Sequence, residues 1–458
     1  MRAVQVTLGL LGLATATSAA LIPLSLNEIR SDEENFTEIK PGDFASLVIT
    51  KENTLNGTYQ GDELTVPPSN DNDQSQIRLS AVAAQLPLEF VNNFGGAVNA
   101  YVTGLDSNNA VVFVRRDGSL FYPSAGGSST PVQIDQNKIK IPVKAGERIN
   151  MKVLKALRSG RVYFSAGALK FGVVRTPTGA GLVQPDEKNP TDPSAGVNWG
   201  FVELTLNADG SVWVNLSYVD FVGLPLGIEL GKQGGGKLSA YGVGPSVVKN
   251  ACVKLKEQAQ KDGRPWGGLC QAGSNGPIRI LSPNSFRVNK PTAFGNYYQD
   301  YVNKVWTKYG QESLTVATQM SAGRVKCRVS SNVMKCDGSN RSFAKPTIND
   351  IWSCDNGPFK LNAGDNKVAE AIIPRLCAAF HRSTFLLSGG NVQPNLGLDK
   401  YYTVSPTNHY SRIVHAHQSD GKGYTFPYDD VLPTGGKDAS GLLTTPKPSK
   451  LTILIGKK

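Results

Sequence analysis

Two carboxylic acids, Glu203 and Asp220, could work as a pair in acid–base chemistry. They lie in the segment 201–226, FVELTLNADGSVWVNLSYVDFVGLPL. One carboxyl group that donates a proton and a second that activates a water can together cleave a glycosidic bond. The two groups must lie roughly 6.5–9.5 Å apart for inversion of the sugar's configuration, or roughly 5–5.5 Å apart for retention. Spacing along the chain alone favours a simpler interpretation, in which Glu203 is a solvated strand residue and Asp220 an ordinary turn residue. The elements that hold the two acids must therefore decide between this interpretation and a catalytic pair.

Alternation of apolar and polar residues predicts a β-hairpin around these acids. Apolar residues occupy every second position on both sides of a turn at 208–210. Matching the two apolar rows places Glu203 opposite Asn215 and Thr205 opposite Trp213. The other face then combines polar groups with an indole, which suits sugar hydroxyls and the apolar face of a pyranose ring. This face carries Glu203, Thr205, Asn207, Trp213, Asn215 and Ser217.

Asp220 breaks the alternation. A regular strand would point it into the core, where an unpaired carboxylate costs several kcal/mol. Fully extended, the chain from Asn215 to Asp220 would span roughly 16 Å. We therefore expect the strand to end or bulge near Tyr218 and Val219, which turns Asp220 back toward the polar face.

The wider pattern predicts a mainly β protein with an α/β part. The chain has 458 residues, 40% of them hydrophobic, with 48 glycines and 27 prolines that favour turn-rich β-structure. We expect a signal peptide at 1–19, a polar extension with little regular structure at 20–80, a β-sandwich or barrel domain at 81–245, a mixed α/β domain at 246–390 and returning strands at 391–458. Helices are expected at 247–260, 297–308 and 368–382, and strands at 398–404, 411–416 and 451–456.

Several features predict a secreted, extracellular protein. Arg2 precedes a short apolar stretch and small residues suited to cleavage, and no other run is long enough to span a membrane. Acceptor sequons for N-glycosylation occur at Asn35, Asn56, Asn215 and Asn340. All six cysteines lie between Cys252 and Cys377, and pairing of sequence neighbours (252–270, 327–336, 354–377) is the simplest of the arrangements that remain open.

Other partners and cofactors find little support. The net charge of +11 is spread along the chain, which argues against nucleic acid and leaves either a solvated basic surface or attraction to an acidic cell wall or matrix. The stretch GKQGGGKL at 231–238 imitates a phosphate-binding loop but has Leu238 where a hydroxyl belongs. His415 and His417 could face one side of a strand, but no third metal ligand of fitting spacing lies nearby. We expect no metal, no cofactor and no membrane partner.

The hairpin and several further motifs resemble a known family. FVELTL followed by VNLSYVDFVGLPL is similar to the acidic-cleft hairpin shared by thaumatin-like proteins and glycoside hydrolase family 64, the β-1,3-glucanases. Further similarities are LPLEFVNN with AYVTGL, GRVYFSAGALKF, CAAFHRSTF at 377–385, NHYSRIVHAH at 408–417 and GYTFPYDDV at 423–431. The resemblance covers residue 80 to the C-terminus. Because 81–245 contains no cysteine and the chain is long, it favours the glucanase branch over the disulfide-rich plant proteins.

The resemblance implies a β-sandwich or barrel beside a mixed α/β domain, with a wide groove that holds a β-1,3-glucan chain. It implies an enzyme that hydrolyses the glucan with inversion and releases short laminari-oligosaccharides, mainly the pentasaccharide. We expect the protein to be a monomer. Glu203 matches the general acid, which must be protonated, and Asp220 the general base, which must be ionised. The matches to groove positions are Thr205, Asn207, Trp213 and Ser217, with Arg161 as a cleft arginine and Asp429 or Asp430 as a late acid.

Two other functions remain open at this level. A non-catalytic β-1,3-glucan-binding protein would use the same groove with acids placed too far apart to react. A secreted defence or toxin-like relative of thaumatin would act on other fungi or on membranes. The sequon at Asn215 departs from the expected pattern, because a glycan there would sit beside the groove unless the site is unoccupied or the side chain points away.

Overall fold

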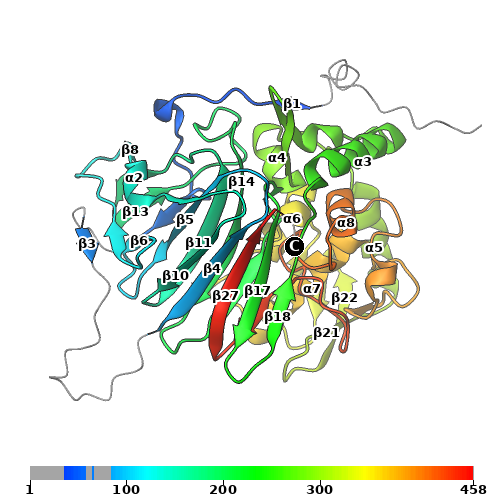
Figure 1. Ribbon diagram of the computed structural model, residues 1–458. Coiled ribbons are helices and arrows are strands. Elements are labelled where there is room, and N and C mark those ends of the chain that lie inside the picture. The colour runs from blue at the N-terminus through cyan, green and yellow to red at the C-terminus, as the bar shows by residue number, and fades with distance from the viewer. Residues whose placement is uncertain (1–35, 58–63, 67–83, 457–458) are drawn as a thin grey trace, which may run out of the picture. The chain divides into compact units, whose positions relative to one another are not determined.

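The computed structural model describes residues 36–57, 64–66 and 84–456, and this part of the chain forms one compact unit (Figure 1). The expected signal peptide at 1–19 and the sequon at Asn35 lie outside the described residues. Strands dominate up to about Ala240, and most helices follow it, as the change in sequence pattern indicated. Among the described residues, no helix has both the length and the apolar character needed to cross a membrane.

The largest sheet has nine strands and contains the hairpin with the two acids. Its order is β26-β15-β14-β11-β5-β6-β7-β3, and β9 pairs with β5 beside this path. The strands are β3 (Leu64–Val66), β5 (Val98–Leu105), β6 (Val111–Val114), β7 (Leu120–Tyr122), β9 (Ile141–Val143), β11 (Leu157–Ala166), β14 (Asn198–Leu206), β15 (Val212–Leu216) and β26 (Leu443–Thr445).

A second sheet of five strands lies against the first (Figure 1). Its order is β10 (Arg148–Val153), β4 (Leu86–Asn92), β27 (Pro448–Ile455), β17 (Leu226–Lys232) and β18 (Lys237–Ala240). The C-terminal strand β27 pairs in parallel with β4 and antiparallel with β17. This confirms the predicted return of 451–456 to the β-domain.

The two sheets enclose a common hydrophobic core, as expected for a sandwich. Phe90 of β4 meets Phe164 of β11 edge to face, with 5.0 Å between the ring centroids. Along β10 the pleat buries Ile149, Met151 and Val153 and leaves the residues between them exposed. Each fully buried side chain of this kind contributes about 1.5–3 kcal/mol, so the alternating pattern is sufficient to specify which face packs inward.

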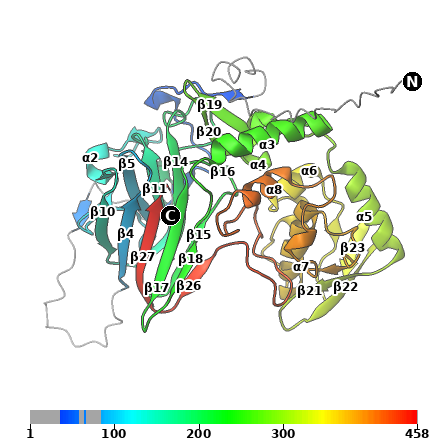
Figure 2. The same cartoon turned by 45° about the vertical axis from the view of Figure 1, so that its right-hand side comes forward.

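Two smaller sheets include strands from the segment 20–80, where the sequence indicated little regular structure. One sheet is β2 (Thr54–Asn56), β13 (Gly179–Val183), β12 (Gly172–Thr176) and β8 (Val132–Gln133). The other is β1 (Thr37–Glu38), β19 (Cys270–Gly273), β20 (Gly276–Leu281) and β16 (Phe221–Val222). It lies beside helix α3 (Val247–Asp262), as Figure 2 shows. β1 and β2 are formed by backbone pairing with distant strands, a long-range effect that local composition does not reveal.

Helices and a further five-stranded sheet make up the remainder. The sheet order is β24 (Phe343–Ala344), β23 (Val333–Cys336), β22 (Arg324–Ser330), β21 (Leu314–Ala317) and β25 (Val392–Gln393). The helices are α3 (Val247–Asp262), α4 (Pro283–Asn289), α5 (Gln299–Gln311), α6 (Ile348–Ser353), α7 (Lys367–Arg382) and α8 (His409–Ala416), with the short α2 (Gln136–Ile139) in the β-rich part.

The expected helices are confirmed, and two expected strands are wrong. α3, α5 and α7 cover 247–260, 297–308 and 368–382 within a few residues. The segment 411–416 is helix α8 instead of a strand, because the Asn408 side chain caps it by accepting from the Ser411 amide at 3.0 Å. The segment 398–404 is a short 3-10 helix, Leu398–Lys400, followed by turns.

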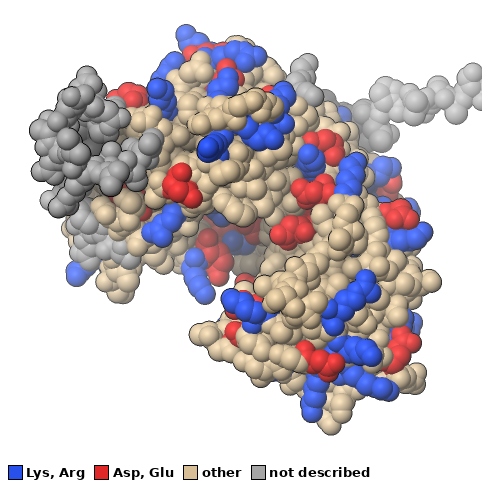
Figure 3. Space-filling model, turned by 90° about the horizontal axis from the view of Figure 1, so that it is seen from below, with Lys and Arg blue, Asp and Glu red and all other residues tan. Residues whose placement is uncertain are grey.

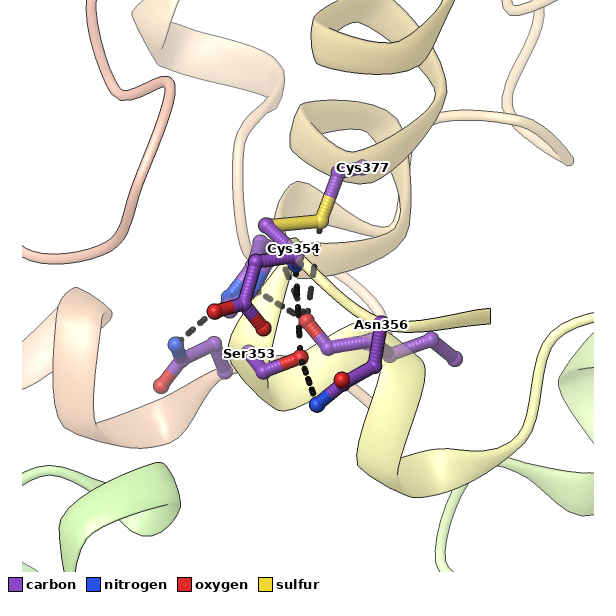
Figure 4. Close-up of a disulfide and its surroundings, with 8 residues drawn as sticks. Ser353, Cys354, Asn356 and Cys377 are labelled. Atoms are coloured by element: carbon purple, nitrogen blue, oxygen red, sulfur yellow. Dashed lines mark hydrogen bonds between the residues drawn. A yellow bond between two sulfur atoms is a disulfide. The ribbon is translucent and has the colours of Figure 1, made fainter. Parts of the chain in front are cut away.

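The six cysteines form three disulfides between sequence neighbours, the simplest of the arrangements that the sequence left open. The pairs are Cys252–Cys270, Cys327–Cys336 and Cys354–Cys377. Figure 4 shows that the Cys354–Cys377 bridge joins the end of α6 to α7. In the turn beside it, the side-chain amide of Asn356 donates to the Ser353 hydroxyl at 3.1 Å. Each bridge contributes about 2–5 kcal/mol to stability, and together they reinforce the α/β part.

Candidate active site

The predicted hairpin has the predicted register. In the β14–β15 ladder Glu203 lies opposite Asn215 and Thr205 opposite Trp213. The Asn207 amide donates to the Ser211 carbonyl at 2.9 Å, which closes the turn. The indole of Trp213 is 49% exposed, so it lies on the surface and not in the core.

The second strand of the hairpin ends before Asp220, the residue that does not follow the alternation of apolar and polar positions. β15 stops at Leu216, whose carbonyl accepts from the Tyr424 amide at 3.1 Å. The Tyr218 amide then donates to the Tyr424 carbonyl at 2.7 Å. These bonds draw the chain away from β14 before Asp220, so the predicted end of the strand is confirmed.

Tyr218 anchors this bend in the core. The Tyr410 hydroxyl on α8 donates to the Tyr218 carbonyl at 2.5 Å, and the Val243 amide donates to the Tyr218 hydroxyl at 3.2 Å. A Cβ atom at Gly242 or Gly423 would collide with the Tyr218 side chain, and both glycines have positive φ. Because only glycine fits these two positions, the bend is packed tightly on both sides.

Asp220 occupies a half-buried position just beyond the bend. Its carbonyl accepts from the Ser282 amide at 2.8 Å, which fixes the backbone there. Burial raises the pKa of the Asp220 carboxyl, while the charges of Lys188 and Arg161 act in the opposite direction and Glu203 adds to the rise. A carboxylate with a raised pKa is a stronger base than an ordinary aspartate.

Glu203 is held by two neighbours on adjacent strands. The Asn215 side-chain amide donates to Glu203 Oε2 at 3.0 Å, and Arg161 Nη2 lies 3.8 Å from Glu203 Oε1. Arg161 faces Glu203 directly across the β11–β14 ladder. The glutamate side chain is nevertheless 39% exposed, so its carboxyl can meet a ligand.

Arg161 connects the two acids electrostatically. Its guanidinium lies over the Phe201 ring, 4.5 Å from the centroid, and donates to the Tyr163 hydroxyl at 3.4 Å. Burial lowers the pKa of Arg161, but Tyr163, Glu203 and Asp220 outweigh it, so the pKa is raised above its usual value. Arg161 is therefore a cation whose charge acts on both acids.

A pocket of about 400 Å³ opens over this strand surface. Of the residues expected at the site, Arg161, Glu203, Thr205 and Trp213 line it. Polar lining residues that the sequence did not single out are Glu52, Thr54, Ser159 and Gln184, together with the sequon residue Asn215. Figure 3 shows the surface of the molecule hollowed, with acidic side chains inside the hollow.

The segment that connects β13 to β14 carries a cluster of ionisable side chains that the sequence analysis does not predict. Lys188 Nζ lies 3.7 Å from Asp186 Oδ1 and 3.3 Å from Glu187 Oε1, and all three side chains are largely buried. Burial raises the pKa of Glu187, and the charge of Asp220 raises it further. The signal in the sequence was three consecutive charged residues in PDEKNP, in a segment that leads into the hairpin.

The remaining expected site residues do not line this pocket. The Asn207 side chain donates to the Ser211 hydroxyl at 2.9 Å near the turn, and Ser217 bridges to Tyr424. Asp430 is exposed. None of Asn207, Ser217, Asp220 and Asp430 lines the pocket, although Asp220 is electrostatically linked to Arg161.

Asp429 is committed to internal ion pairs. Its Oδ1 accepts from Arg382 Nη2 at 3.0 Å, and its Oδ2 lies 2.8 Å from His415 Nε2. Thr425 donates to the same Oδ2 from its hydroxyl at 2.9 Å. Of the two candidate late acids, Asp429 therefore has a structural role.

The histidines provide no metal site within the described residues. His415 and His417 lie at the end of helix α8 and not on a strand, and His417 Nδ1 contacts the Ile413 carbonyl at 2.8 Å. The one cluster of three possible ligand atoms in the described part is Cys354, Cys377 and His381, and its two sulfurs form a disulfide.

Residues 84–455 match the β-1,3-glucanase family, glycoside hydrolase family 64, and the chain belongs to that family. A glucan endo-1,3-beta-glucosidase of Cellulosimicrobium cellulans is 29% identical over 361 residues, and one of Arthrobacter sp. (strain YCWD3) is equally similar. The matched region is 77% of this chain and 62% of each of those relatives, so the chain spans less than two thirds of their length.

Solved structures show the same fold. A laminaripentaose-producing β-1,3-glucanase in complex with laminaritetraose superposes with a TM-score of 0.70 and 29% identity, over 82% of this chain and 99% of that one. A family 64 β-1,3-glucanase domain from Clostridium beijerinckii superposes with a TM-score of 0.62 and 20% identity, over 81% and 98% of the two chains. The latter similarity supports the fold alone.

Proposed function

We propose that this protein is an endo-β-1,3-glucan hydrolase that cleaves its substrate with inversion and releases short laminari-oligosaccharides. The observation that carries the proposal is the pocket over the hairpin, where Arg161 across the ladder and the Asn215 side-chain amide hold Glu203 beside the Trp213 indole. Membership of the β-1,3-glucanase family and the relatives' names support the same activity. A laminaripentaose-producing relative of 29% identity supports a short oligosaccharide product.

In this proposal Glu203 is the general acid and Asp220 the general base. Glu203 gives its proton to the glycosidic oxygen as the bond from that oxygen to the anomeric carbon breaks. Asp220 takes a proton from a water whose oxygen attacks the anomeric carbon from the opposite face. The raised pKa of Asp220 makes it more effective in this step.

Substrate binding would use the exposed side of the hairpin. The Trp213 indole offers a flat surface for the apolar face of a glucose ring, and Thr205 beside it offers a hydroxyl. Glu52, Thr54, Ser159 and Gln184 supply further polar groups to the same pocket, on strands and loops around the hairpin. A neutral polysaccharide rich in hydroxyls fits this combination of one aromatic and several polar side chains.

Secretion is part of the same proposal. It is supported by the N-terminal sequence pattern and by three disulfides, which form in oxidising compartments. Recovery of the mature protein from culture medium, with its N-terminus determined by sequencing, tests this part separately.

Laminarin hydrolysis tests the main proposal. Glu203→Gln and Asp220→Asn should each lower the turnover number by at least about a thousandfold, while Asp209→Asn, on the turn of the same hairpin, should retain activity. With inversion, NMR during the first turnovers should detect the new reducing end as the α-anomer. Binding of laminarin without products would identify a non-catalytic glucan-binding protein, and initial release of the β-anomer would contradict inversion.

A further inference from the structure

The outward face of the small sheet in the α/β part concentrates positive charge. Strand β22 alternates strictly, with Val325 and Cys327 buried and every residue between and beside them exposed. Lys335 of β23 lies directly opposite Arg328 of β22. We call the exposed set the basic face; it consists of Arg324, Lys326, Arg328 and Lys335.

These cations lack acidic partners among the described residues. Arg324, Lys326 and Lys335 form no ion pair there, and Asp337 is the one acidic residue that shares the hollow over this face. Arg328 donates to the Gln311 carbonyl at 2.8 Å, at the C-terminal end of α5. Like charges opposite each other on neighbouring strands are destabilising, so folding alone gives no reason for this arrangement.

A disulfide joins β22 and β23, the two strands that carry the cations. Cys327 and Cys336 are the register pair next to Arg328 and Lys335, and their disulfide brings the two Cα atoms to 4.0 Å. Both cysteines are buried on the opposite face of the sheet. The bridge therefore holds the like charges together and prevents the strands from separating.

A hollow of about 600 Å³ lies over this face, with Lys326, Arg328 and Lys335 in its lining. Ser313 and Ser330 add hydroxyl groups, and no aromatic side chain is among the lining residues. Without aromatics the hollow offers no stacking surface for nucleic-acid bases. Without a buried apolar anchor it does not resemble the centre of a protein–protein interface.

We propose that the basic face binds an anionic polysaccharide, whose phosphate, sulfate or carboxylate groups meet the cations while sugar hydroxyls meet the serines. Successive outward residues on a strand are roughly 6.6 Å apart, so the row on β22 presents regularly spaced cations to an extended charged polymer. The site is separate from the pocket at Glu203, and it does not depend on the hydrolytic activity proposed for that pocket.

Binding of the full-length protein to immobilised polymers tests this proposal. The probes are a phosphate-bearing mannan, heparin as a sulfated glycan, polygalacturonate as a carboxylated one, and neutral laminarin. The test variant is R324Q/K326Q/K335Q, which keeps Arg328 and its contacts with α5. The control variant K144Q/K152Q/K249Q removes the same charge from exposed lysines elsewhere.

The wild type should bind at least one charged polymer, and the three probes distinguish which anion is preferred. The test variant should bind that polymer at least about tenfold more weakly, with a shallower dependence on salt, and the control variant should match the wild type. Laminarin hydrolysis should be the same in all three proteins. Equal losses in both variants, or no retention of the wild type by any charged polymer, would overturn the proposal.

Discussion

The side-chain amide of Asn215 donates a hydrogen bond to the carboxylate of Glu203, with 3.0 Å between Nδ2 and Oε2. Nδ2 is also the atom to which an N-linked glycan would be attached, because Asn215, Leu216 and Ser217 form an acceptor sequon. Of the two possibilities left by the sequence, a side chain that points away from the site is therefore wrong. An occupied sequon would place a glycan on the lining of the pocket.

We predict that Asn215 is unglycosylated in the active protein. The residue is half-buried in a strand, and its amide is engaged by Glu203. Mass spectrometry of peptides from protein made in a glycosylating host should find Asn215 unmodified in the fraction that hydrolyses laminarin. A glycan on Asn215 in fully active protein would contradict this prediction.

The same hydrogen bond should matter for turnover. Asn215→Ala removes a hydrogen bond to a carboxyl group, worth about 1.5–3 kcal/mol, and lets the Glu203 side chain rotate. We expect the turnover number on laminarin to fall about ten- to a hundredfold, with a smaller change in KM. Asn340→Ala, which removes a sequon asparagine far along the chain, is the control and should leave both constants unchanged.

The decrease of kcat/KM at low pH should follow the protonation of Asp220. Burial raises the pKa of this carboxyl, so the ionised base is lost on acidification at a higher pH than for an ordinary aspartate, whose pKa is about 3.9. Lys188→Met removes the cation that most strongly lowers the pKa of Asp220 and should shift the limb of kcat/KM to still higher pH. Lys152→Met, at an exposed position, should leave the limb in place.

Stability should depend on Asp220 in the opposite sense to that of most carboxylates. Because the folded pKa lies above the unfolded one, the folded state binds the proton more tightly. The free energy of unfolding should therefore decrease as pH rises from about 4 through the folded pKa. Urea unfolding across this range should show a smaller decrease for Asp220→Asn than for the wild type, and equal slopes would contradict the assignment.

A second pH dependence should come from the ion pair of His415 with Asp429. Burial lowers the pKa of His415, but the charge and hydrogen bond of Asp429 outweigh it, so the pKa is raised. The stabilisation is complete below about 6.5, the unfolded value, and is lost as pH rises through the folded pKa. His415→Gln should remove this dependence and lower the free energy of unfolding by about 1–3 kcal/mol.

His417→Gln is the matched control, because His417 lies at the same helix end and contacts a backbone carbonyl. It should retain the wild-type pH dependence. Since Thr425 bonds to Asp429 and the neighbouring Tyr424 pairs with the end of β15, loss of His415 should also disturb the bend before Asp220. Laminarin hydrolysis should therefore fall in His415→Gln and not in His417→Gln.

Trp213 should contribute to glucan binding and little to folding. Half of its side chain is exposed, so Trp213→Ala creates no cavity in the core. Loss of stacking on a sugar ring, worth about 0.5–1.5 kcal/mol by analogy with aromatic pairs, should weaken laminarin binding about two- to tenfold, with no large change in Tm. Trp213→Phe should recover part of the affinity. An unchanged binding curve for Trp213→Ala would exclude this role.

Prediction from the sequence succeeded where the pattern is local. Alternation identified the hairpin and its register, because a shift of one residue would have moved every apolar side chain of β15 to the wrong face. The prediction of a strand at 411–416 is wrong because six residues cannot distinguish the helical period from the strand period when the capping residue, Asn408, lies outside them.

The sequence alone determined the face shared by Glu203, Thr205 and Trp213, and the need for a break before Asp220, since both follow from alternation and from the cost of burying a charge. Only the tertiary structure decided what holds that break. Tyr410, 192 positions from Tyr218, and Tyr424 meet the end of β15, and Gln184 and Thr54 complete the pocket. Contacts between residues so far apart depend on how whole sheets and helices pack, and no local pattern encodes that packing.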